Sequence, residues 1–593
     1  MGERAPKSTL TERVRSLSEL IEADRLRSIG VDLDATAMID AERSVSWNEV
    51  DREVGALASA LASIGVRRHD RVGVRMLKSV DSFLAVHAIL RAGGVVVPLD
   101  PMSPPDAGRR VAADAHLTAL VVDARAPHHI RFIDAVGPTP TILRGTATSP
   151  GSVEAPVLDA DDVAGFGPLT PVANRPDDAA YVIYTSGSTG DPKGIVHTHG
   201  SALAYATAAA VEYELTAHDR LANFAPLHFD QSTFELYSAP LAGASVAVIG
   251  DAQLRFPASI VDFLDETAST VWYTVPSLLS QLEQRTDLAE RDLASLRLVL
   301  YGGESFAPDA VRRFMAAVPG VTLSNVYGPA EVNQCTRYDL AEAPTGDAAI
   351  PIGRAWSAAD TAVVRIDDDS DTVAVPETDT AAVSETETDG RAAADRVGEL
   401  FVRSATAMRG YWHRADLTAT VLVENPADFG EVIDRRDGRI DHATHENSPQ
   451  QWLRTGDLVS VGQDGLMRFI GRRDHQVKVR GQRVELEMVD TVLASAPGVA
   501  EGVAVVDGPP DARSIVAIVV RAEPGDPPDV QTGDVRSDMT NDEDFARSVR
   551  EYAAGRVPPV AAPSAVHVVD RLARTTTGKV SRRESLAAVA AMM

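Results

Sequence analysis

Residues 184–194 read YTSGSTGDPKG, and they directly follow the apolar run AAYVI at 179–183. Glycine and hydroxyl residues at the end of a strand expose backbone N–H groups and Ser/Thr hydroxyls that bind anions. Lys193 adds a mobile positive charge, and the helical pattern of HGSALAYATAAAVEY (199–213) predicts a helix N-terminus close to the same place. The stretch therefore predicts a loop that binds a polyphosphate.

The loop differs from the P-loop of nucleotide triphosphatases. That motif requires G-x-x-x-x-G-K-[ST], whereas Lys193 follows Pro192. A second candidate, TTTGKV at 575–580, has Val580 where Ser or Thr is required and Ala573 where the first Gly is required. A lone loop of this kind is more often a flexible surface turn, so its meaning depends on the rest of the chain.

Between about 46 and 320, short β-rich apolar runs alternate with helical patterns. The runs are GVVVPL, LTALVVD, ASVAVIG, TVWYTV and LRLVLYGG, and the helical stretches include EVGALASALASIG and SIVDFLDETA. This alternation predicts α/β layers with largely parallel sheets. After about 397 the apolar runs are shorter and more strand-like. Past 475, strand-like and helical patterns alternate in a way that predicts a small α+β part. Because 593 residues exceed what one hydrophobic core holds, the chain divides, most naturally near GRRDHQ at 471–476.

The formal net charge of −28 argues against nucleic acid and anionic membranes as partners. Much of it is local: 367–389 holds nine acidic residues and no basic one, and 524–544 is similar, so both stretches predict disordered surface insertions. The lone Cys335 excludes an internal disulfide and a cysteine-based metal cage. The chain has no apolar run of about 18 residues, and its charged N-terminus lacks the apolar core of a secretory signal. We expect a cytoplasmic protein.

Lysine is scarce, since only five of the 57 basic residues are Lys. A chain this rich in Arg keeps Lys mainly where a compact, flexible point charge is needed. Three of the five, Lys193, Lys478 and Lys579, fall in the Gly-containing stretches DPKG, QVKVRG and TTTGK. Each is therefore a pointer to a site.

Further motifs stand in order around the loop. They are SWNEVDREVGALASAL (46–61), LRAGGVVVPLDP (90–101), FDQSTFELY (229–237), NVYGPAE (325–331), GELFVRSATAMRGYW (398–412), RTGDL (454–458), GRRDHQVKVRGQRVEL (471–486) and TTTGKVSRRESL (575–586). With YTSGSTGDPKG, this series resembles the adenylate-forming (ANL) superfamily, specifically the amino-acid-activating adenylation domains of nonribosomal peptide synthesis. The resemblance runs from about residue 46 to 588.

The resemblance implies an α/β fold. Its large N-terminal domain would hold two α/β subdomains with parallel-rich sheets plus a small β-barrel-like part, and a small mobile α+β C-terminal domain would follow. The N-terminal adenylation core would cover residues 1–473, with the acidic insertion at about 366–397. The C-terminal domain would cover 474–593 and swing about a hinge at Asp474.

The implied reaction uses ATP and Mg²⁺ to convert an amino acid to aminoacyl-AMP, which then passes to the phosphopantetheine thiol of a carrier protein. Catalysis of such a step is positioning and charge stabilisation. Tyr327 would pack on adenine, Asp457 would accept both ribose hydroxyls and Arg472 would also bind ribose. Glu331 would hold Mg²⁺. The phosphates would be held by Thr185, Ser186, Gly187, Ser188, Thr189, Gly190 and Lys193.

The C-terminal domain would supply further catalytic groups. Lys579 would reach the reacting carboxylate and the α-phosphate during adenylation, and after the swing the KVRGQR loop would replace it, with Lys478 close to the nucleotide. The chain shows no carrier signature of the GGxS type, so the expected acceptor is a separate carrier protein.

The substrate pocket follows from the same resemblance. Asp230 stands where family members pair a carboxylate with the substrate's amino group, and a buried ammonium needs such a partner. The other pocket positions are Gln231, Phe234, Tyr273, Leu300, Gly302, Val326, Gln334 and Cys335. They predict a neutral amino acid, aliphatic or small and polar, with the α or β position of the amino group left open.

Two departures from the family pattern and two alternatives remain. Ala330 replaces a usual Thr whose hydroxyl binds the α-phosphate, and Ser404 replaces a usual Gly. His197 and His199 are interpreted as packing or capping residues. The alternatives are an acyl- or aryl-CoA ligase, which Asp230 opposes, and a noncatalytic nucleotide-binding relative, which only Ala330 favours.

Overall fold

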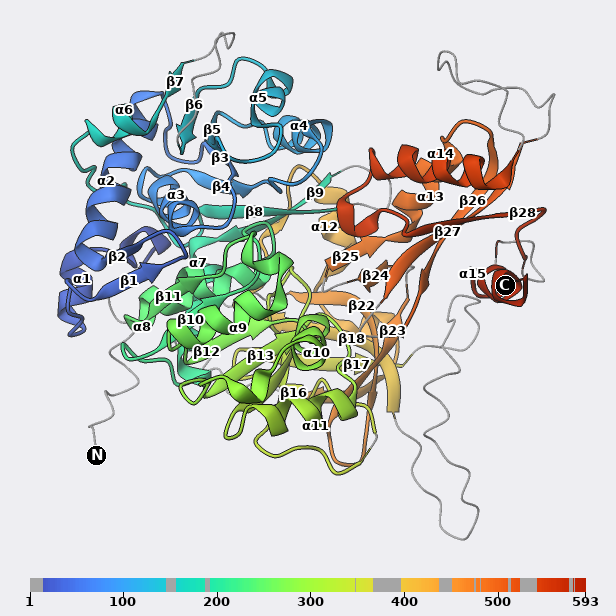
Figure 1. Cartoon of the computed structure of the whole chain (residues 1–593). Helices are drawn as coiled ribbons and strands as arrows, with labels where there is room; N and C mark the ends of the chain where they lie inside the picture. The colour runs from blue at the N-terminus through green and yellow to red at the C-terminus, as the bar shows by residue number, and fades with distance from the viewer. Residues whose placement is uncertain are drawn as a thin grey trace.

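The computed structural model describes residues 14–145, 156–186, 192–346, 348–365, 396–436, 451–473, 476–479, 482–509, 513–522, 541–574, 580 and 582–592. Two sheet-and-helix layers and a third, antiparallel sheet make up the N-terminal part, and a smaller α+β part follows beyond residue 476 (Figure 1). The predicted fold class is confirmed.

The first large sheet has eight strands in the order β19-β9-β8-β4-β3-β5-β6-β7, and the run from β8 through β4 to β7 is parallel. β9 and β19 add antiparallel strands at its edge. The strands are β3 Arg71–Arg75, β4 Val95–Pro98, β5 Ala119–Asp123, β6 Thr141–Arg144, β7 Val157–Leu158, β8 Ala179–Ser186, β9 Pro192–Thr198 and β19 Gly410–Tyr411.

The second large sheet has nine strands in the order β16-β15-β14-β13-β12-β10-β11-β1-β2, parallel from β14 through β1. The strands are β1 Thr36–Ile39, β2 Ser44–Ser46, β10 Arg220–Asn223, β11 Ser245–Val248, β12 Val271–Thr274, β13 Leu298–Gly302, β14 Thr322–Tyr327, β15 Thr336–Leu340 and β16 Arg354–Ala355. Each apolar run quoted above from this region forms a strand of one of the two sheets.

Both faces of these sheets are buried, which explains why their strands read as continuous apolar runs. In β12, Val271 faces the core between the two sheets, whereas its neighbour Trp272 faces the opposite core under α9–α11. The helices are α1 Ala23–Ser28, α2 Trp47–Ser63, α3 Val80–Arg91, α4 Pro105–Asp114, α5 His129–Val136, α6 Ala160–Ala164, α7 His199–Glu212, α8 Ala239–Ala242, α9 Pro257–Glu266, α10 Pro276–Arg285 and α11 Pro308–Ala317. Short 3₁₀ and π turns are Leu17–Glu19, Asp230–Ser232, Phe234–Ser238, Gln253–Arg255 and Leu288–Glu290.

The third sheet corresponds to the predicted barrel-like part. It is antiparallel and six-stranded, with the path β20-β22-β18-β17-β21 and β23 paired to β22. Its elements are β17 Ala359–Val364, β18 Arg396–Ser404, β20 Leu422–Val423, β21 Val432–Arg436, β22 Trp452–Val461, β23 Met467–Arg472, α12 Ala415–Val421 and the 3₁₀ turn Pro426–Phe429. The acidic insertion lies between β17 and β18, and its residues 366–395 are outside the described residues.

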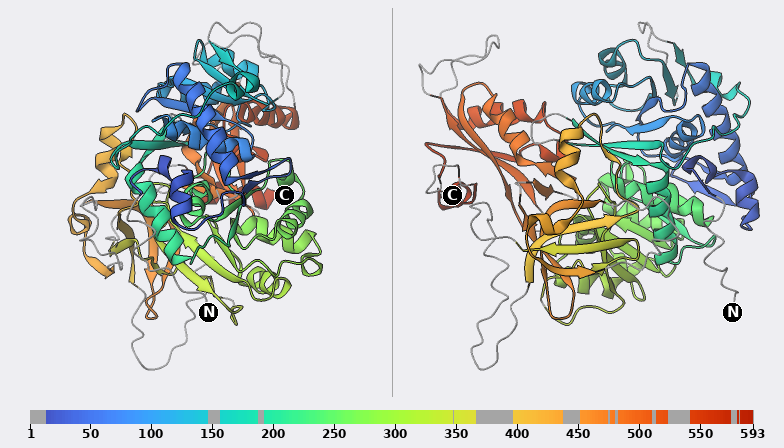
Figure 2. Two further views of the ribbon diagram at one scale, coloured as in Figure 1. Left: turned by 90° about the vertical axis from the view of Figure 1, so that its left-hand side faces the viewer. Right: turned by 180° about the vertical axis from the view of Figure 1, so that it is seen from behind.

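The C-terminal part has its own apolar clusters, built from residues beyond 476. Its elements are β24 Gln476–Val479, β25 Gln482–Glu485, α13 Leu486–Ala494, β26 Val499–Asp507, β27 Ser514–Arg521, α14 Asp542–Ala554, the 3₁₀ turn Pro559–Ala561, β28 Ala565–Val569 and α15 Arg582–Met592. Figures 1 and 2 place α15 at the outer edge, away from the large sheets. The prediction that 524–544 is a disordered insertion is wrong at its C-terminal end. Asn541 caps α14 by accepting a hydrogen bond from the N–H of Glu543, so residues 541–544 belong to the helix and its cap.

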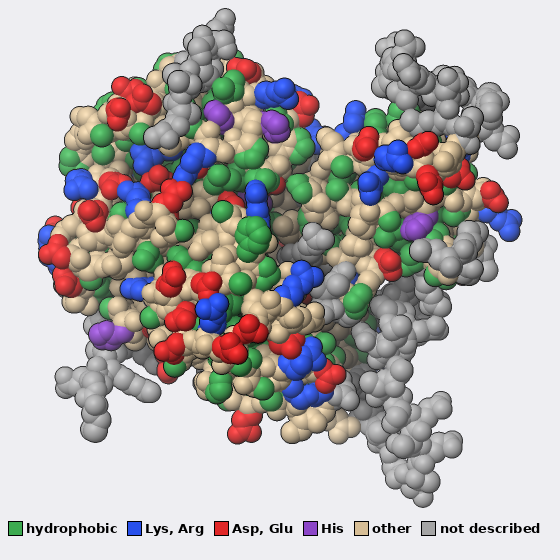
Figure 3. Space-filling model, viewed as in Figure 1, with side chains coloured by type: hydrophobic (Ala, Val, Ile, Leu, Met, Phe, Trp, Pro, Cys, Tyr) green, Lys and Arg blue, Asp and Glu red, His purple; other side chains and the backbone are tan. Residues whose placement is uncertain are grey.

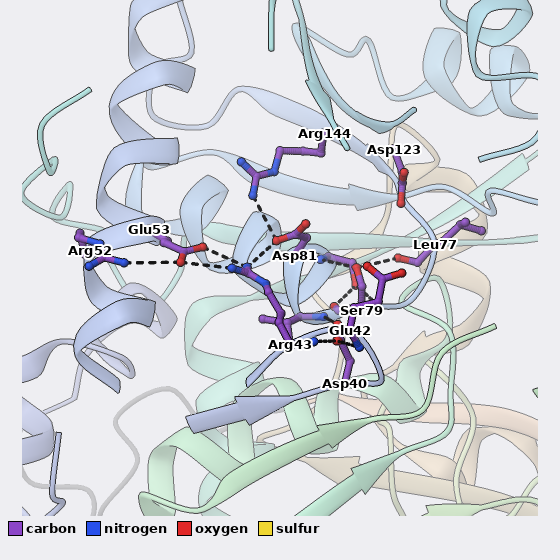
Figure 4. A network of polar contacts seen from close by, with 12 residues as sticks. Asp40, Glu42, Arg43, Arg52, Glu53, Leu77, Ser79, Asp81, Asp123 and Arg144 are labelled. Atoms are coloured by element: carbon purple, nitrogen blue, oxygen red, sulfur yellow. Dashed lines mark hydrogen bonds and ion pairs between the residues drawn. The ribbon is translucent and has the colours of Figure 1, made fainter. Parts of the chain in front are cut away.

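A polar network joins the β1–β2 turn, α2, α3 and β6 (Figure 4). Arg43 donates to Glu53 of α2 at 3.0 Å and to Asp81 of α3 at 2.5 Å, and Arg144 of β6 also reaches Asp81 at 3.2 Å. On the molecular face shown in Figure 3, acidic and basic side chains of the described residues are interspersed. In the part of the chain that the structure describes, no helix is long and apolar enough to cross a membrane.

Candidate functional site

A cavity of about 250 Å³ opens where the parallel strands of both large sheets end and the C-terminal part meets them. Residues at or just after the carboxyl ends of β4, β8, β12, β13 and β14 line it, which is the usual position of a ligand site in an open α/β sheet. Seven residues predicted from the sequence line this one cavity: Thr185, Asp230, Gln231, Tyr273, Val326, Asp457 and Arg472.

The described residues of the predicted phosphate loop lie on the paired antiparallel strands β8 and β9. Thr185, which lines the cavity, pairs with Lys193 on β9. Nζ of Lys193 lies 4.3 Å from the ring centroid of Tyr411. Residues 187–191, which include the predicted Gly187, Ser188, Thr189 and Gly190, lie outside the described residues, and so does the side chain of Ser186.

One prediction about this loop is wrong. The N-terminus of α7 does not adjoin the loop, because the seven-residue strand β9 separates them by roughly 23 Å. The first N–H groups of α7 are also occupied: those of His199 and Gly200 bind the carbonyls of Asp178 and Pro176, and that of Ser201 binds the Thr198 hydroxyl. The helix therefore offers no free N–H groups to a phosphate.

Tyr327, Asp457 and Arg472 form one buried polar cluster at the cavity. The Tyr327 hydroxyl donates to Asp457 Oδ2, and Arg472 Nη1 donates to Asp457 Oδ1 at 2.5 Å. The cross-strand pairing of Asp457 on β22 with Arg472 on β23 brings these two residues together. Burial, followed by the negative charge of Asp457, raises the pKa of Tyr327 well above its usual value. Both oxygens that would accept the ribose hydroxyls thus already accept hydrogen bonds from protein groups.

Glu331 lies behind the cavity rather than in its lining, and it is buried. Its Oε1 accepts a hydrogen bond of 2.7 Å from the hydroxyl of Tyr411. The same tyrosine ring faces the Lys193 ammonium, so Tyr411 connects the predicted phosphate and metal residues. No group of three or more potential metal ligands occurs among the described residues.

The predicted substrate residues divide into a lining set and a supporting set. Asp230, at the start of a 3₁₀ turn, lines the cavity with Gln231, Tyr273 and Val326. The supporting residues Phe234, Leu300, Gly302, Gln334 and Cys335 are buried around them and outside the lining.

The supporting residues fix the shape of the substrate end. Phe234 packs edge-on against Tyr273 and Tyr213, with ring centroids 5.8 and 5.9 Å apart. Gln334 exchanges two hydrogen bonds with the Tyr213 hydroxyl, at 2.7 and 3.0 Å. Its amide is therefore engaged by the protein rather than offered to a substrate.

Several lining residues were not predicted. His228 and Phe229 precede Asp230, and burial lowers the pKa of His228. Gly303 follows β13, and Asn333 lies in the turn after NVYGPAE. Their positions next to the quoted motifs are the signal that could have identified them.

His197 and His199, interpreted above as packing or capping residues, make contacts within the protein, and so does Ser404. His197 is fully buried and its Nε2 lies 2.9 Å from the carbonyl of Ala330, and burial lowers its pKa to about 4. His199 Nδ1 accepts from the N–H of Leu17 at 3.1 Å. The Ser404 hydroxyl donates to the carbonyl of Ala358. Ala330 itself lines the cavity.

The C-terminal part closes the cavity with β25 and α13. Gln482, Val484 and Met488 line it. Asp474 and Lys579 lie outside the described residues, as does the side chain of Lys478 on β24. Arg574 and Val580, which flank the Lys579 segment, pair with each other away from the cavity lining, and Arg574 binds Glu501 at 2.7 Å.

The sequence was compared with protein families and with individual known proteins. The chain matches the AMP-binding enzyme family over residues 27–412 and the AMP-binding enzyme C-terminal domain over 488–579. It is 29% identical to an L-proline–[L-prolyl-carrier protein] ligase of Pseudomonas fluorescens, covering 92% of this chain and 95% of the relative. A second such ligase, from Streptomyces coelicolor, is 32% identical, with 78% and 80% covered.

Solved structures share the fold. The adenylation domain AlmE of Vibrio cholerae, in complex with glycyl-adenosine-5'-phosphate, superposes with a TM-score of 0.73 at 20% identity, covering 100% of this chain and 99% of that one. The amide bond synthetase McbA of Marinactinospora thermotolerans gives 0.72 at 23% identity, covering 96% and 98%. Motifs, cavity and family match lead to one conclusion: the chain belongs to the AMP-binding enzyme family.

Proposed function

We propose that this protein is a ligase that activates a neutral amino acid with ATP and loads it onto a carrier protein. In the first step a carboxylate oxygen attacks the α-phosphorus of ATP, pyrophosphate leaves and aminoacyl-AMP forms. In the second step the phosphopantetheine thiol attacks the acyl carbon, and AMP leaves. The observation that carries the proposal is the shared cavity, in which Asp230 lies with Asp457 and Arg472.

The nucleotide end would use the residues already described. Thr185 and Lys193 would bind phosphate oxygens, and Asp457 and Arg472 would bind ribose. Little covalent chemistry falls to the protein in this reaction, so these groups act by holding the α-phosphate in line with the attacking carboxylate.

Glu331 fits a magnesium ion by the chemistry of its side chain. Mg²⁺ prefers one or two carboxylates together with substrate phosphate oxygens, and Glu331 supplies one buried carboxylate next to the phosphate-binding hairpin. When bound, Mg²⁺ would neutralise phosphate charge. The contribution of the protein is to hold Glu331 in place through Tyr411.

The substrate end favours an apolar side chain. The amide of Gln334, one of the two predicted pocket glutamines, is bound by Tyr213. The ring of Tyr273 lines the cavity, and Phe234 packs behind it. A branched or cyclic aliphatic amino acid fits this surface. Proline is the first candidate to test, because both named relatives are L-prolyl-carrier protein ligases.

The C-terminal part would take two positions. In this structure Gln482 of the KVRGQR segment and Val484, which follows it, line the cavity, and the family resemblance leads us to expect this arrangement for thioester formation. Adenylation would require the Lys579 segment there instead, after rotation about the predicted hinge at Asp474. We infer a cytoplasmic location, where ATP is available.

The test is amino-acid-dependent ATP–pyrophosphate exchange across the proteinogenic amino acids and several β-amino acids. We expect exchange with one neutral amino acid, its loss in Asp230→Asn, and its retention in Asp416→Asn, a matched change on the exposed face of α12. Lys579→Ala should abolish exchange, and Lys7→Ala should not.

A second assay separates the acceptors. The wild type should transfer the activated amino acid to a phosphopantetheinylated carrier protein faster than to free coenzyme A. Exchange with simple carboxylic acids only, or transfer to coenzyme A only, would identify an acyl-CoA ligase and refute the proposal.

A further inference from the structure

One helix that lines the cavity is attached to the two strands that carry predicted phosphate residues. α4 lies beside β9 (Figure 1) and supplies the lining residues Ala107, Gly108, Arg110 and Val111. Its last residue is Asp114, whose Oδ2 accepts a hydrogen bond of 2.6 Å from the Tyr184 hydroxyl. Tyr184 stands on β8 directly before Thr185, and it also lines the cavity. This hydrogen bond therefore joins two walls of the cavity.

A second hydrogen bond reaches Asp114 from the strand on the other side of β9. The indole Nε1 of Trp412, the residue after β19, donates to the backbone carbonyl of Asp114 at 3.1 Å. The backbone N–H of Trp412 donates to the carbonyl of Gly194 on β9 at 2.7 Å. Because β9 lies between β8 and β19 in the sheet, Asp114 is tied to strands on both sides of it.

Gly194 is the place where these groups meet. It pairs with Tyr184 across β8 and β9, next to the pair formed by Thr185 and Lys193. A Cβ on Gly194 would lie 2.9 Å from Cζ of Tyr184 and 3.1 Å from Cβ of Trp412, so only Gly permits this packing. Successive residues of a strand are about 3.3 Å apart. A shift of the Tyr184–Gly194 pair would therefore move the Thr185–Lys193 pair with it.

Asp114 is suited to hold other residues rather than to contact the ligand. It is outside the cavity lining, and a carboxylate would repel phosphate groups. Burial, followed by the hydrogen bond to Asp114, raises the pKa of Tyr184, so this hydroxyl keeps its proton and donates. A hydrogen bond to an ionised acceptor is stronger than one between neutral groups, which makes this tie a firm one.

The inference rests on the proposed function. We propose that Asp114 is a positioning residue for ATP: it holds β8 and β9 where Thr185 and Lys193 can bind phosphate oxygens. It acts through Tyr184 and Trp412, and it contacts no reacting atom. The amino acid should be unaffected, because Asp230 makes neither of these hydrogen bonds.

The test measures pyrophosphate exchange with the amino acid that the wild type prefers. Tyr184→Phe removes the donor and Asp114→Ala removes the acceptor. Because a hydrogen bond to a charged group is lost between half-buried residues, each change should raise the KM for ATP about 3- to 10-fold. The amino-acid KM should not change, and neither should the inhibition constant of AMP, which lacks the β- and γ-phosphates.

Two further variants separate positioning from direct contact. Asp114→Asn keeps an accepting oxygen, so its KM for ATP should rise by at most about threefold. The double variant Asp114→Ala/Tyr184→Phe should be no worse than either single variant, because both remove the same hydrogen bond. Additive effects would overturn the inference, since Tyr184 would then act on the ligand independently of Asp114.

Asp106→Ala is the matched control, because it removes a carboxylate from the first turn of the same helix, where the side chain is 88% exposed. It should leave all three constants unchanged. An unchanged KM for ATP in folded Asp114→Ala would overturn the inference alone. An equal rise in the amino-acid KM would also overturn it, since the whole cavity would then have changed shape. Absence of exchange in the wild type would overturn the proposed function as well.

Discussion

Tyr411→Phe tests whether the β8–β9 hairpin, with its predicted phosphate residues, and the predicted metal residue Glu331 work as one unit. Tyr411 is nearly buried, its hydroxyl donates to Glu331 Oε1 at 2.7 Å, and its ring lies under the Lys193 ammonium. Phe keeps the ring and the ammonium contact but removes the hydrogen bond. A hydrogen bond to a buried charged group contributes about 1.5–3 kcal/mol.

That free energy predicts two effects. Glu331 would be held less firmly, so the Mg²⁺ concentration for half-maximal pyrophosphate exchange should rise by about tenfold or more. The free energy of unfolding in urea should also fall by about 1.5–3 kcal/mol. The KM for the amino acid should stay the same, because Tyr411 is outside the cavity lining.

Tyr301→Phe is the matched control. Tyr301 is buried in the core beneath α11, and its hydroxyl has no partner among the described residues, so its removal should change neither Mg²⁺ dependence nor exchange. Magnesium dependence that is unchanged in folded Tyr411→Phe would refute the role given to this tyrosine. Tyr411→Leu, which also removes the aromatic ring, should in addition raise the KM for ATP through Lys193.

Three further changes have defined outcomes. Tyr327→Phe removes a donor to buried Asp457, so the unfolding free energy in urea should fall by about 1.5–3 kcal/mol, and an unchanged midpoint would contradict the hydrogen bond. Gly302→Ala places a Cβ 2.3 Å from the Val326 carbonyl oxygen. The free energy of unfolding should therefore fall by about 1–3 kcal/mol, and the amino-acid KM should rise. An unchanged melting temperature would be inconsistent with this contact. Burial raises the pKa of Glu235 to about 8 from 4.5, so the folded state loses stability as the pH rises from 4.5 through 8. Glu235→Gln should flatten urea-unfolding stability between those pH values, and equal slopes would disprove the shift.

Local sequence patterns were sufficient to predict individual strands and helices. The apolar runs became strands, SWNEVDREVGALASAL became α2 with a capping box between Ser46 and Glu49, and HGSALAYATAAAVEY became α7. The error about the α7 N-terminus arose from β9. Its sequence, PKGIVHT, begins with residues typical of turns, and only antiparallel pairing with β8 makes it a strand.

Contacts between residues far apart in the sequence could not be predicted from local sequence patterns. Tyr213 and Gln334 are 121 residues apart, and Tyr411 and Glu331 are 80 apart. In the sequence, nothing near any of these four residues indicates which residue it will contact. The resemblance placed Gln334 in the pocket, but only the structure brings Tyr213, the residue after α7, against it. That contact engages the Gln334 amide, which would otherwise have been expected to contact the substrate.

The arrangement of the C-terminal part gives the proposed two-step reaction a physical basis. Among its described residues, Arg582 pairs with Asp490 at 2.7 Å and Arg574 pairs with Glu501, and the apolar clusters of these residues contain no residue of the large sheets. A rotation of this part as one body would break none of these contacts. It would exchange Gln482 and Val484 for another segment at the cavity, while Asp230, in its 3₁₀ turn, and Asp457, on β22, stay with the N-terminal part. One bound adenylate could therefore meet two different sets of groups in turn, and the predicted hinge at Asp474 lies where such a rotation would start.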